Sequence, residues 1–379
     1  MKHCLEGSNA VAKIVAKCQP AVVSAYPITP QTHIVEDLSK IKADGKADFE
    51  FIRADSEFAA ASIVLGAAAT GVRTYTATAS QGLLLMTEVL FTIAGLRLPM
   101  VLTCANRAVS APINIWNDQQ DAMTVRDSGW IMFFAEDNQE AVDLHPIAYK
   151  VSEATRLPVM VNMDGFILTH TYEPIDLPSE AQLKKFLPKY QPEKGQFLDV
   201  HDPKSLGCFA TPDDYMEIRR DLFDDMKSSE KIIKQEFSNY KKIFKRGSNG
   251  LTEYYGHKKA DMVFVAMGSV VGTVKEAVDE LNDQGLKCGV LKLKVFRPFP
   301  VQEVVSKLSG VKKVAVLEKA VSIGAEGVLA GEVKACLNSP KQKIQSFIVG
   351  LGGRDVTRKN IKSLYKKIQQ KNNKTVFSG

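Results

Sequence analysis

Three polar side chains follow predicted strands in the first third of the sequence, and their chemistry is complementary. Thr29 follows the first predicted strand, Glu57 the second and Arg107 the fourth. Because the carboxyl ends of neighbouring parallel strands converge in space, we expect these side chains to line one crevice. A hydroxyl, a carboxylate and a guanidinium around one cleft suit a cationic heteroaromatic ligand and an anionic substrate, since arginine is the natural partner of a carboxylate.

Each of the three also has an ordinary structural interpretation. Two prolines flank Thr29 and stiffen the backbone, which suits a strand-to-helix turn with Thr29 or Thr32 as the helix cap. Glu57 suits a helix cap or a surface carboxylate, and Arg107 suits a salt bridge at a strand end. The local sequence leaves both interpretations open.

Alternating apolar segments predict the elements that hold these side chains. Strands are predicted at 21–24, 48–52, 73–77, 99–104, 130–134 and 157–163. Helices are predicted at 8–18, with Ser8 or Asn9 as the cap, and at 32–40, 58–70, 83–94 and 138–153. This alternation predicts a parallel sheet covered by helices on both faces.

The second half of the sequence divides into a charged connection and another α/β unit. The connection covers 177–256 and contains one predicted surface helix at 213–244. The second unit has predicted strands at 261–267, 287–293, 313–317 and near 346–349, and helices from 272 to 282 and at 322–336. The predicted domains are therefore 1–240, including the linker, and 257–379. The turn from Gly268 to Gly272 suits either a phosphate or a tight turn without a ligand.

Composition limits the class of protein. The chain has 379 residues, of which 45% are apolar and 24% charged, as in ordinary globular proteins. No apolar run approaches the roughly 20 residues of a membrane span, and the first residues lack a secretory signal, so we expect a cytoplasmic protein. The net charge of +6 lies largely in the connection and the C-terminal tail, without interleaved aromatics. This pattern argues against nucleic-acid binding, and the tail suits an acidic partner protein.

Cysteine spacing argues against a metal centre in this chain. The six cysteines are Cys4, Cys18, Cys104, Cys208, Cys288 and Cys336. No two are close in sequence, whereas iron–sulfur and zinc sites normally include a short cysteine spacing. We therefore expect buried free thiols, with no cluster and no metal site.

Four motifs in the same order resemble the α subunit of pyruvate:ferredoxin oxidoreductases. They are YPITP at 26–30, DSEFA at 55–59, TATASQGL at 76–83, and NRA at 106–108 with NIWND at 114–118. The resemblance covers nearly the whole chain. It implies an α/β fold in which a pyrimidine-binding domain for thiamine diphosphate precedes a domain like the C-terminal domain of transketolase.

The resemblance also implies roles for individual residues. Glu57 matches the carboxylate that hydrogen-bonds pyrimidine N1′ of the cofactor, Arg107 the arginine that holds the substrate carboxylate, and Thr29 the hydroxyl that positions the 2-oxoacid. The implied cofactor-binding residues are Pro27, Ile28, Glu57, Ser80 and Gln81.

What the sequence lacks implies partner subunits. A diphosphate-binding domain needs a Gly-Asp-Gly segment, and only Met163-Asp164-Gly165 comes close. A β subunit is therefore expected to share the cofactor and to supply Mg²⁺ and an iron–sulfur cluster, with γ and ferredoxin-like δ subunits completing the complex. The implied reaction converts pyruvate and coenzyme A to acetyl-CoA and CO2 and reduces ferredoxin.

Two alternatives stay open at this stage. Gln119 and Gln120 stand where this family pattern has a His or Ser, which leaves room for a branched-chain 2-oxoacid such as 2-oxoisovalerate. The other alternative is a catalytically silent α/β scaffold that only assembles partner subunits.

Overall fold

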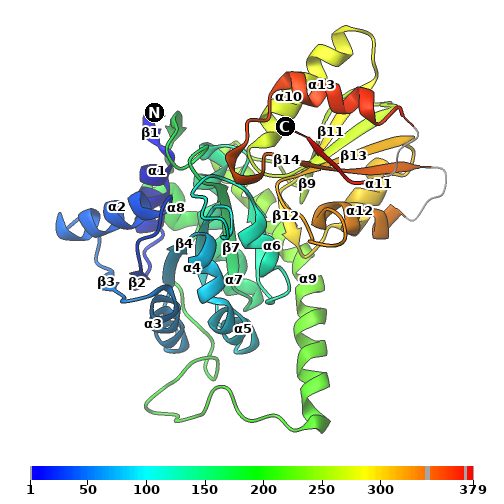
Figure 1. Cartoon of the computed structure of the whole chain (residues 1–379). Helices are drawn as coiled ribbons and strands as arrows, with labels where there is room; N and C mark the ends of the chain where they lie inside the picture. The colour runs from blue at the N-terminus through cyan, green and yellow to red at the C-terminus, as the bar shows by residue number, and fades with distance from the viewer. Residues whose placement is uncertain (1, 338–341, 371–373, 379) are drawn as a thin grey trace.

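The computed structural model describes residues 2–337, 342–370 and 374–378. Its described strands form a seven-stranded sheet, a six-stranded sheet and a two-stranded ribbon, with helices packed around the two larger sheets (Figure 1). The α/β fold class predicted from the sequence is confirmed. None of the helices in this described part is long and apolar enough to cross a membrane.

The seven-stranded sheet belongs mainly to the first half of the chain. Its spatial order is β12-β6-β7-β5-β4-β2-β3. The strands are β2 (Val22–Ala25), β3 (Glu50–Arg53), β4 (Thr74–Thr78), β5 (Val101–Asn106), β6 (Ile131–Phe134), β7 (Val159–Asp164) and β12 (Val295–Arg297). All pairs are parallel except β12 with β6. Strands β4 to β7 are buried along their whole length because helices cover both faces.

Consecutive residues of the central strands enter two different cores. Val101 packs with α1 (Gly7–Lys17), α2 (Thr32–Ala43) and α7 (Asn138–Thr155) on one face. Leu102 packs with the helices of the other face. These are α3 (Glu57–Ala69), α4 (Ser80–Leu85), α5 (Thr87–Gly95) and α6 (Gln120–Thr124). The strand period of two thus sorts the apolar side chains between two helical layers.

Three local predictions in this half differ from the structure. The helix predicted at 83–94 is two short helices, α4 and α5, that meet at Met86. The predicted cap of α1 is wrong, because the cap position is Glu6 and the Ser8 hydroxyl donates to the Thr169 carbonyl instead. A ribbon of β1 (Lys2–Glu6) and β8 (Tyr172–Asp176), both largely exposed, was not predicted.

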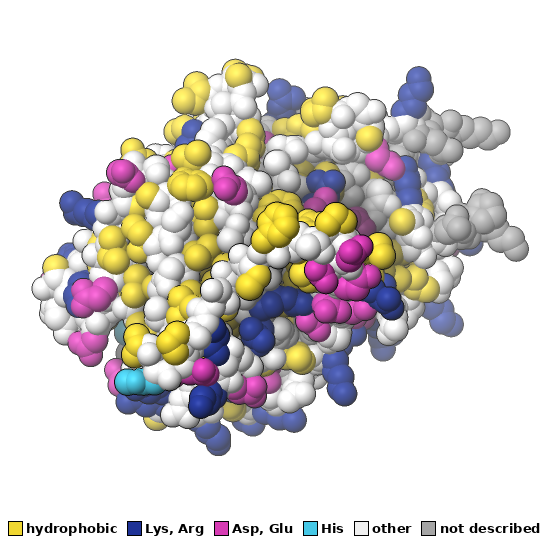
Figure 2. All heavy atoms as spheres, turned by 90° about the horizontal axis from the view of Figure 1, so that it is seen from below, with side chains coloured by type: hydrophobic (Ala, Val, Ile, Leu, Met, Phe, Trp, Pro, Cys, Tyr) yellow, Lys and Arg dark blue, Asp and Glu magenta, His cyan; other side chains and the backbone are white. Residues whose placement is uncertain are grey.

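The connection holds α8 (Glu180–Phe186) and the 33-residue helix α9 (Pro212–Phe244). The C-terminal part of α9 packs on α7 through Ile233, Phe237 and Tyr240. Its other end projects away from the body (Figure 1), where Tyr215 and Met216 are 58% and 70% exposed. Seen from that end, yellow and magenta side chains gather around the projecting part (Figure 2). The helix predicted here is therefore largely exposed in its first half, whereas its second half buries one face on the protein and exposes residues such as Lys231 and Gln235 on the other.

The six-stranded sheet forms the second unit, in the order β15-β14-β13-β10-β11-β9. Its strands are β9 (Thr252–Gly256), β10 (Met262–Ala266), β11 (Cys288–Leu293), β13 (Lys313–Glu318), β14 (Lys343–Val349) and β15 (Val376–Ser378), and only β9 is antiparallel to its neighbour. Its helices are α10 (Val270–Asp283), α11 (Val301–Leu308), α12 (Val328–Leu337) and α13 (Arg358–Lys367), with a 3₁₀ turn at Leu351–Gly353.

The two units share structure across the predicted boundary. Strand β12 comes from the second half of the chain but extends the first sheet, and one apolar core contains side chains from both sheets. Strand β9 precedes residue 257 and pairs with β11. The predicted domain limits, 1–240 and 257–379, stay predictions.

All six cysteines are free thiols. Cys18, Cys104 and Cys288 are buried, as predicted, whereas Cys4 and Cys208 are exposed. Burial raises the pKa of the Cys288 thiol to about 12, so this group stays protonated and behaves as an apolar core residue.

Candidate functional site

The carboxyl ends of β4 and β5 are held together by a buried carboxylate from α6. Asp121 accepts hydrogen bonds from the Ser80 amide at 3.0 Å, the Arg107 amide at 2.9 Å and Asn106 Nδ2 at 3.0 Å. Burial raises the pKa of Asp121, and the bonds from the two amides oppose that rise. Sequence reasoning did not assign this role, because nothing local marks Asp121 as the residue that joins two strand ends.

Arg107 and Thr29 lie side by side, as predicted. Arg107 Nη1 donates to the Thr29 carbonyl at 2.9 Å, and Nε donates to the Asn114 carbonyl at 3.0 Å. The arginine is only 7% exposed, yet it forms no ion pair with any described carboxylate. Burial accordingly lowers its pKa. The salt-bridge interpretation of Arg107 is wrong, and the site contains a buried cation whose protein partners are neutral carbonyls.

Glu57 opens α3 and is buried, with 7% of its surface exposed. Ser56 caps this helix by accepting a hydrogen bond from the Ala59 amide at 3.1 Å, so Glu57 is neither the cap nor a surface carboxylate. Within the described ranges the Glu57 carboxylate forms no hydrogen bond or ion pair, and its oxygens are not among the polar atoms that are fully enclosed without a partner. The oxygens therefore stay open from within a largely buried side chain and are free to accept a hydrogen bond from a ligand.

Gly82 lets the Glu57 carboxylate lie close to the end of β4. A Cβ atom at Gly82 would lie 2.6 Å from Glu57 Oε1 and 2.5 Å from Thr78 Oγ1. Thr78 Oγ1 is itself buried without a partner among the residues that the structure describes, as is Gln81 Nε2 on the same helix as Gly82. We call the surface formed by Glu57, Thr78, Gln81 and Gly82 the Glu57 wall. Its polar atoms can still form hydrogen bonds with a ligand that both donates and accepts.

The remaining predicted cofactor residues frame this wall. Ser80 adopts a left-handed backbone conformation with φ of 48°, and its hydroxyl donates to the Ala108 carbonyl. The Ile28 amide donates to Gln31 Oε1 at 3.2 Å, while Gln31 Nε2 donates to the Ala77 carbonyl at 2.7 Å. Gln31, which the sequence analysis did not select, thus fixes the turn that carries Thr29. Pro27, next to Ile28, and Thr29 are exposed.

Asp164 is paired with other side chains inside the protein. Lys319 Nζ lies 2.9 Å from Asp164 Oδ2 and 2.7 Å from Asn117 Oδ1. Gln119 Nε2 donates to Asp164 Oδ1 at 3.0 Å. Burial alone would raise the pKa of Asp164, but the Lys319 charge holds it below its usual value. The Ser269 amide donates to Asp164 Oδ2 at 3.1 Å, so the 268–272 turn faces a protein carboxylate.

The two glutamines that departed from the expected motif serve the contact between the units. Gln119 bonds Asp164 as above, and Gln120 Oε1 accepts from the Val321 amide at 2.9 Å. A side chain at Gly268 would come within 2.4 Å of Gln119 Nε2, so this approach requires glycine. Through Gly268 and Val321, the second unit therefore contacts the loop that follows Arg107 and holds it in place.

A cavity of about 1070 Å³ lies at the opposite, amino ends of β2, β3 and β4. Lysines from α1, α2 and the α8 region line it, including Lys13, Lys40 and Lys184. None of the predicted site residues lines this cavity, so it is separate from the Glu57 wall.

Comparison with known proteins gives two family matches. Residues 13–238 match the family described as "Pyruvate flavodoxin/ferredoxin oxidoreductase, thiamine diP-bdg". Residues 260–361 match "Pyruvate:ferredoxin oxidoreductase core domain II". The first match alone covers more than half of the chain, and it contains every predicted site residue.

Two curated relatives align along nearly the whole chain. The pyruvate synthase subunit PorA of Methanothermobacter thermautotrophicus is 45% identical, over 99% of this chain and 97% of the relative. The ketoisovalerate oxidoreductase subunit VorA of Pyrococcus abyssi is 41% identical, over 96% of this chain and 92% of the relative.

One solved structure has the same fold at low sequence identity. It is a 2-oxoglutarate:ferredoxin oxidoreductase from Magnetococcus marinus, with a TM-score of 0.75 and 21% identity. The match covers 97% of this chain but only 65% of the solved chain. At this identity the likeness supports the fold alone.

Proposed function

The chain belongs to the pyruvate flavodoxin/ferredoxin oxidoreductase family, and on this premise we propose that it is the α subunit of a pyruvate:ferredoxin oxidoreductase. In this reaction pyruvate and coenzyme A give acetyl-CoA and CO2, and two electrons pass to ferredoxin. The observation that carries the proposal is the Glu57 side chain, which is 7% exposed, lies against Gly82 and has no partner for its carboxylate among the described residues.

The residues around Glu57 fit the aminopyrimidine ring of thiamine diphosphate. When bound, the cofactor supplies the nucleophilic carbon and the electron sink for decarboxylation of a 2-oxoacid. Glu57 would hold a proton between its carboxylate and ring nitrogen N1′, which is general acid–base work. Thr78 Oγ1 and Gln81 Nε2, both buried and unpaired, offer further hydrogen bonds to a polar ring.

Arg107 and Thr29 would hold the substrate beside that ring. The Arg107 guanidinium uses Nε and Nη1 on carbonyl oxygens and keeps Nη2 for an incoming carboxylate. An anion at this point would also relieve the cost of burying an unpaired positive charge. Thr29 is an exposed residue whose carbonyl accepts from this guanidinium, and its hydroxyl would orient the 2-oxo group.

The active site would be completed by other chains of the complex. Pro27 and Thr29 are exposed at the edge of the site, and Asp164, the one candidate for a diphosphate motif, is paired with Lys319. The proposal therefore assigns Mg²⁺, the diphosphate contacts and an iron–sulfur cluster to a β subunit. It also includes γ and ferredoxin-like δ subunits, soluble ferredoxin and a cytoplasmic location.

Replacing Glu57 with Gln tests the proposal in the reconstituted complex. The isosteric amide cannot carry the proton, so pyruvate- and coenzyme-A-dependent viologen reduction should fall by at least about 100-fold, the lower range for general acid–base catalysis. The matched control is Glu50→Gln, a carboxylate on β3 whose side chain is 74% exposed. Unchanged turnover in Glu57→Gln would defeat the catalytic role and favour the scaffold alternative.

Substrate choice is tested with the same complex. The pyruvate synthase subunits are 45–47% identical to this chain and the ketoisovalerate subunits 40–41%. We therefore expect a higher kcat/KM for pyruvate than for 2-oxoisovalerate. The opposite order would replace pyruvate by a branched-chain substrate while leaving the reaction type in place.

A further inference from the structure

Two histidines and a glutamate from distant parts of the chain meet behind the Thr29 turn. His33 Nδ1 lies 2.8 Å from Glu6 Oε1, and the rings of His33 and His170 are 4.6 Å apart between centroids. One potential ligand atom from each of the three residues lies within 4.8 Å of the other two. All three side chains are half-buried, so the cluster is open to solvent without lying flat on the surface.

The fold brings these residues together through the β1–β8 ribbon and α2. Glu6 ends β1 and pairs with Tyr172 of β8. The Ser8 amide donates to the Thr169 carbonyl at 3.0 Å, which places His170 beside the start of α1. Helix α2 packs on α1 and begins at Thr32, one residue before His33. Spacings of 27 and 137 residues hide such a site from sequence reasoning.

The donor set suits a transition metal of the zinc class. Two imidazole nitrogens and a carboxylate oxygen are ligands of zinc sites that keep a position for water. Bonds of about 2.0–2.1 Å in a tetrahedral arrangement require ligand atoms roughly 3.3 Å apart. Glu6 and His33 are closer than this and would separate slightly as a metal ion replaced the proton between them. The His33 side chain is 45% exposed and has room to turn.

His170 is already oriented by a neighbouring hydroxyl. Its Nδ1 lies 2.7 Å from Thr169 Oγ1, which leaves Nε2 for a metal ion. Histidine ligands in metal sites commonly donate from the second ring nitrogen to such a partner, which fixes the ring and its tautomer. The Phe166 ring, 4.7 Å from that of His170, limits its movement further.

We propose that Glu6, His33 and His170 bind one divalent transition metal ion, which fastens the Thr29 turn to the segment that follows β7. The two parts already touch, since a Cβ atom at Gly165 would lie 2.6 Å from Pro30 Cγ. His33 lies three residues beyond Pro30. The site lies outside the Glu57 wall, so it acts on the position of the turn and takes no part in the chemistry there.

The experiment titrates the full chain with Zn²⁺ by calorimetry and with Co²⁺ by visible absorption. Both are carried out in a Cys4→Ser, Cys208→Ser background, because exposed thiols would compete for these ions. We expect one equivalent to bind and the thermal midpoint to rise with metal concentration, since an ion that binds only the folded state stabilises it. This readout is independent of catalytic activity.

Three variants decide the assignment. His33→Ala and His170→Gln should each weaken binding by at least about 10-fold and reduce the metal-dependent rise in midpoint accordingly. His201→Ala, an exposed histidine elsewhere, should bind as the parent does. Equal affinity in all variants, or no stoichiometric binding in the parent, would overturn the proposal. Circular dichroism without metal establishes that His33→Ala is folded.

Discussion

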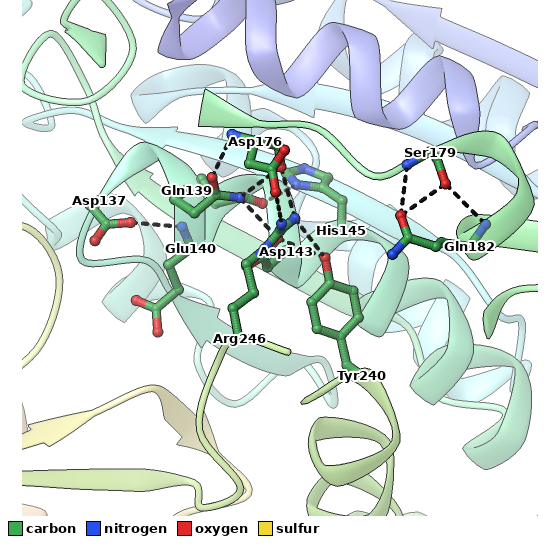
Figure 3. Close-up of polar contacts among 11 residues, drawn as sticks. Asp137, Gln139, Glu140, Asp143, His145, Asp176, Ser179, Gln182, Tyr240 and Arg246 are labelled. Atoms are coloured by element: carbon green, nitrogen blue, oxygen red, sulfur yellow. Dashed lines mark hydrogen bonds and ion pairs between the residues drawn. The ribbon is translucent and has the colours of Figure 1, made fainter. Parts of the chain in front are cut away.

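Two arginines of this molecule, the half-buried Arg246 and the buried Arg107, differ in what surrounds them. Arg246 follows α9 and points at α7 together with Tyr240 (Figure 3). Its Nε lies 2.9 Å from Asp143 Oδ2, its Nη1 2.8 Å from Asp176 Oδ2, and its Nη2 2.8 Å from the Asp176 carbonyl. The Arg107 guanidinium donates to two carbonyl oxygens and has no described carboxylate in ion-pair contact.

The two pKa directions follow from these surroundings. Burial alone would lower the pKa of Arg246, but the hydrogen bonds and charge of Asp143 raise it above its usual value. Burial lowers the pKa of Arg107, and the charge of Asp121 offsets only part of this. Arg246, which is paired with carboxylates, stabilises the fold. Arg107, which has no ion-pair partner among the described residues, keeps its positive charge available for a ligand. The predictions below test this distinction.

The largest expected effect is on stability, in Arg246→Ala. Removing this guanidinium leaves Asp143 buried without a cation, which typically costs about 3–5 kcal/mol. Urea unfolding of the full chain measures the loss, and Arg220→Ala, on the exposed half of α9 with 79% of its side chain exposed, is the control. Unfolding free energies that match in the two variants would show that the network in Figure 3 does not stabilise the fold.

Arg107→Ala should lower catalytic activity and leave stability unchanged or higher. Losing a charged hydrogen-bond donor to the substrate removes about 2–3 kcal/mol of transition-state stabilisation, which is a roughly 30- to 150-fold lower kcat/KM for pyruvate, mainly through KM. Stability should be unchanged or higher, because the variant no longer buries an unpaired charge. The reconstituted complex and urea unfolding measure the two effects. Normal pyruvate kinetics would remove Arg107 from the substrate site.

The sequence predicts the elements around this site better than the contacts that fix it. The ends of β2, β4 and β5 are visible as apolar segments followed by polar or proline-rich turns, so Thr29 and Arg107 were placed together correctly. The Asp121 bridge and the Gln31 link were not visible. Each joins segments that are far apart in sequence, and only the folded sheet brings those segments together.

Contacts between distant segments also explain why the sequence did not predict strand β12, the β1–β8 ribbon and the cluster that depends on it. Strand β12 has three residues and belongs to the first sheet although it follows β11 of the second. Its apolar pattern is too short to predict a strand or a partner. The ribbon of β1 and β8 buries little, so no alternation marks it. The cluster of Glu6, His33 and His170 depends on that ribbon and was missed with it.

The smallest expected effect concerns a carboxylate that, in contrast to Asp143, forms no ion pair with any described residue. Asp118, in the loop after Arg107, is 5% exposed, and its oxygens accept from the Gln120 amide at 3.0 Å and the Gly352 amide at 3.2 Å. Burial raises its pKa to about 6, although the Gln120 amide opposes the rise. The folded state therefore holds a proton here that the unfolded chain releases near pH 4.

This carboxyl group should stabilise the protein at low pH and lose that contribution as pH rises from about 4 to about 6. Asp118→Asn removes the titration and keeps one acceptor oxygen. The unfolding free energy of the parent, minus that of Asp118→Asn, should therefore fall by about 2 kcal/mol over this range, since one pKa unit corresponds to 1.36 kcal/mol and some solvent reaches the site. Urea unfolding at closely spaced pH values gives this difference. If the unfolding free energies of the parent and of Asp118→Asn depend on pH in the same way, the Asp118 carboxyl group does not titrate with a raised pKa in the folded state. The difference between paired and unpaired buried charges would then hold for the two arginines and not for the carboxylates Asp143 and Asp118.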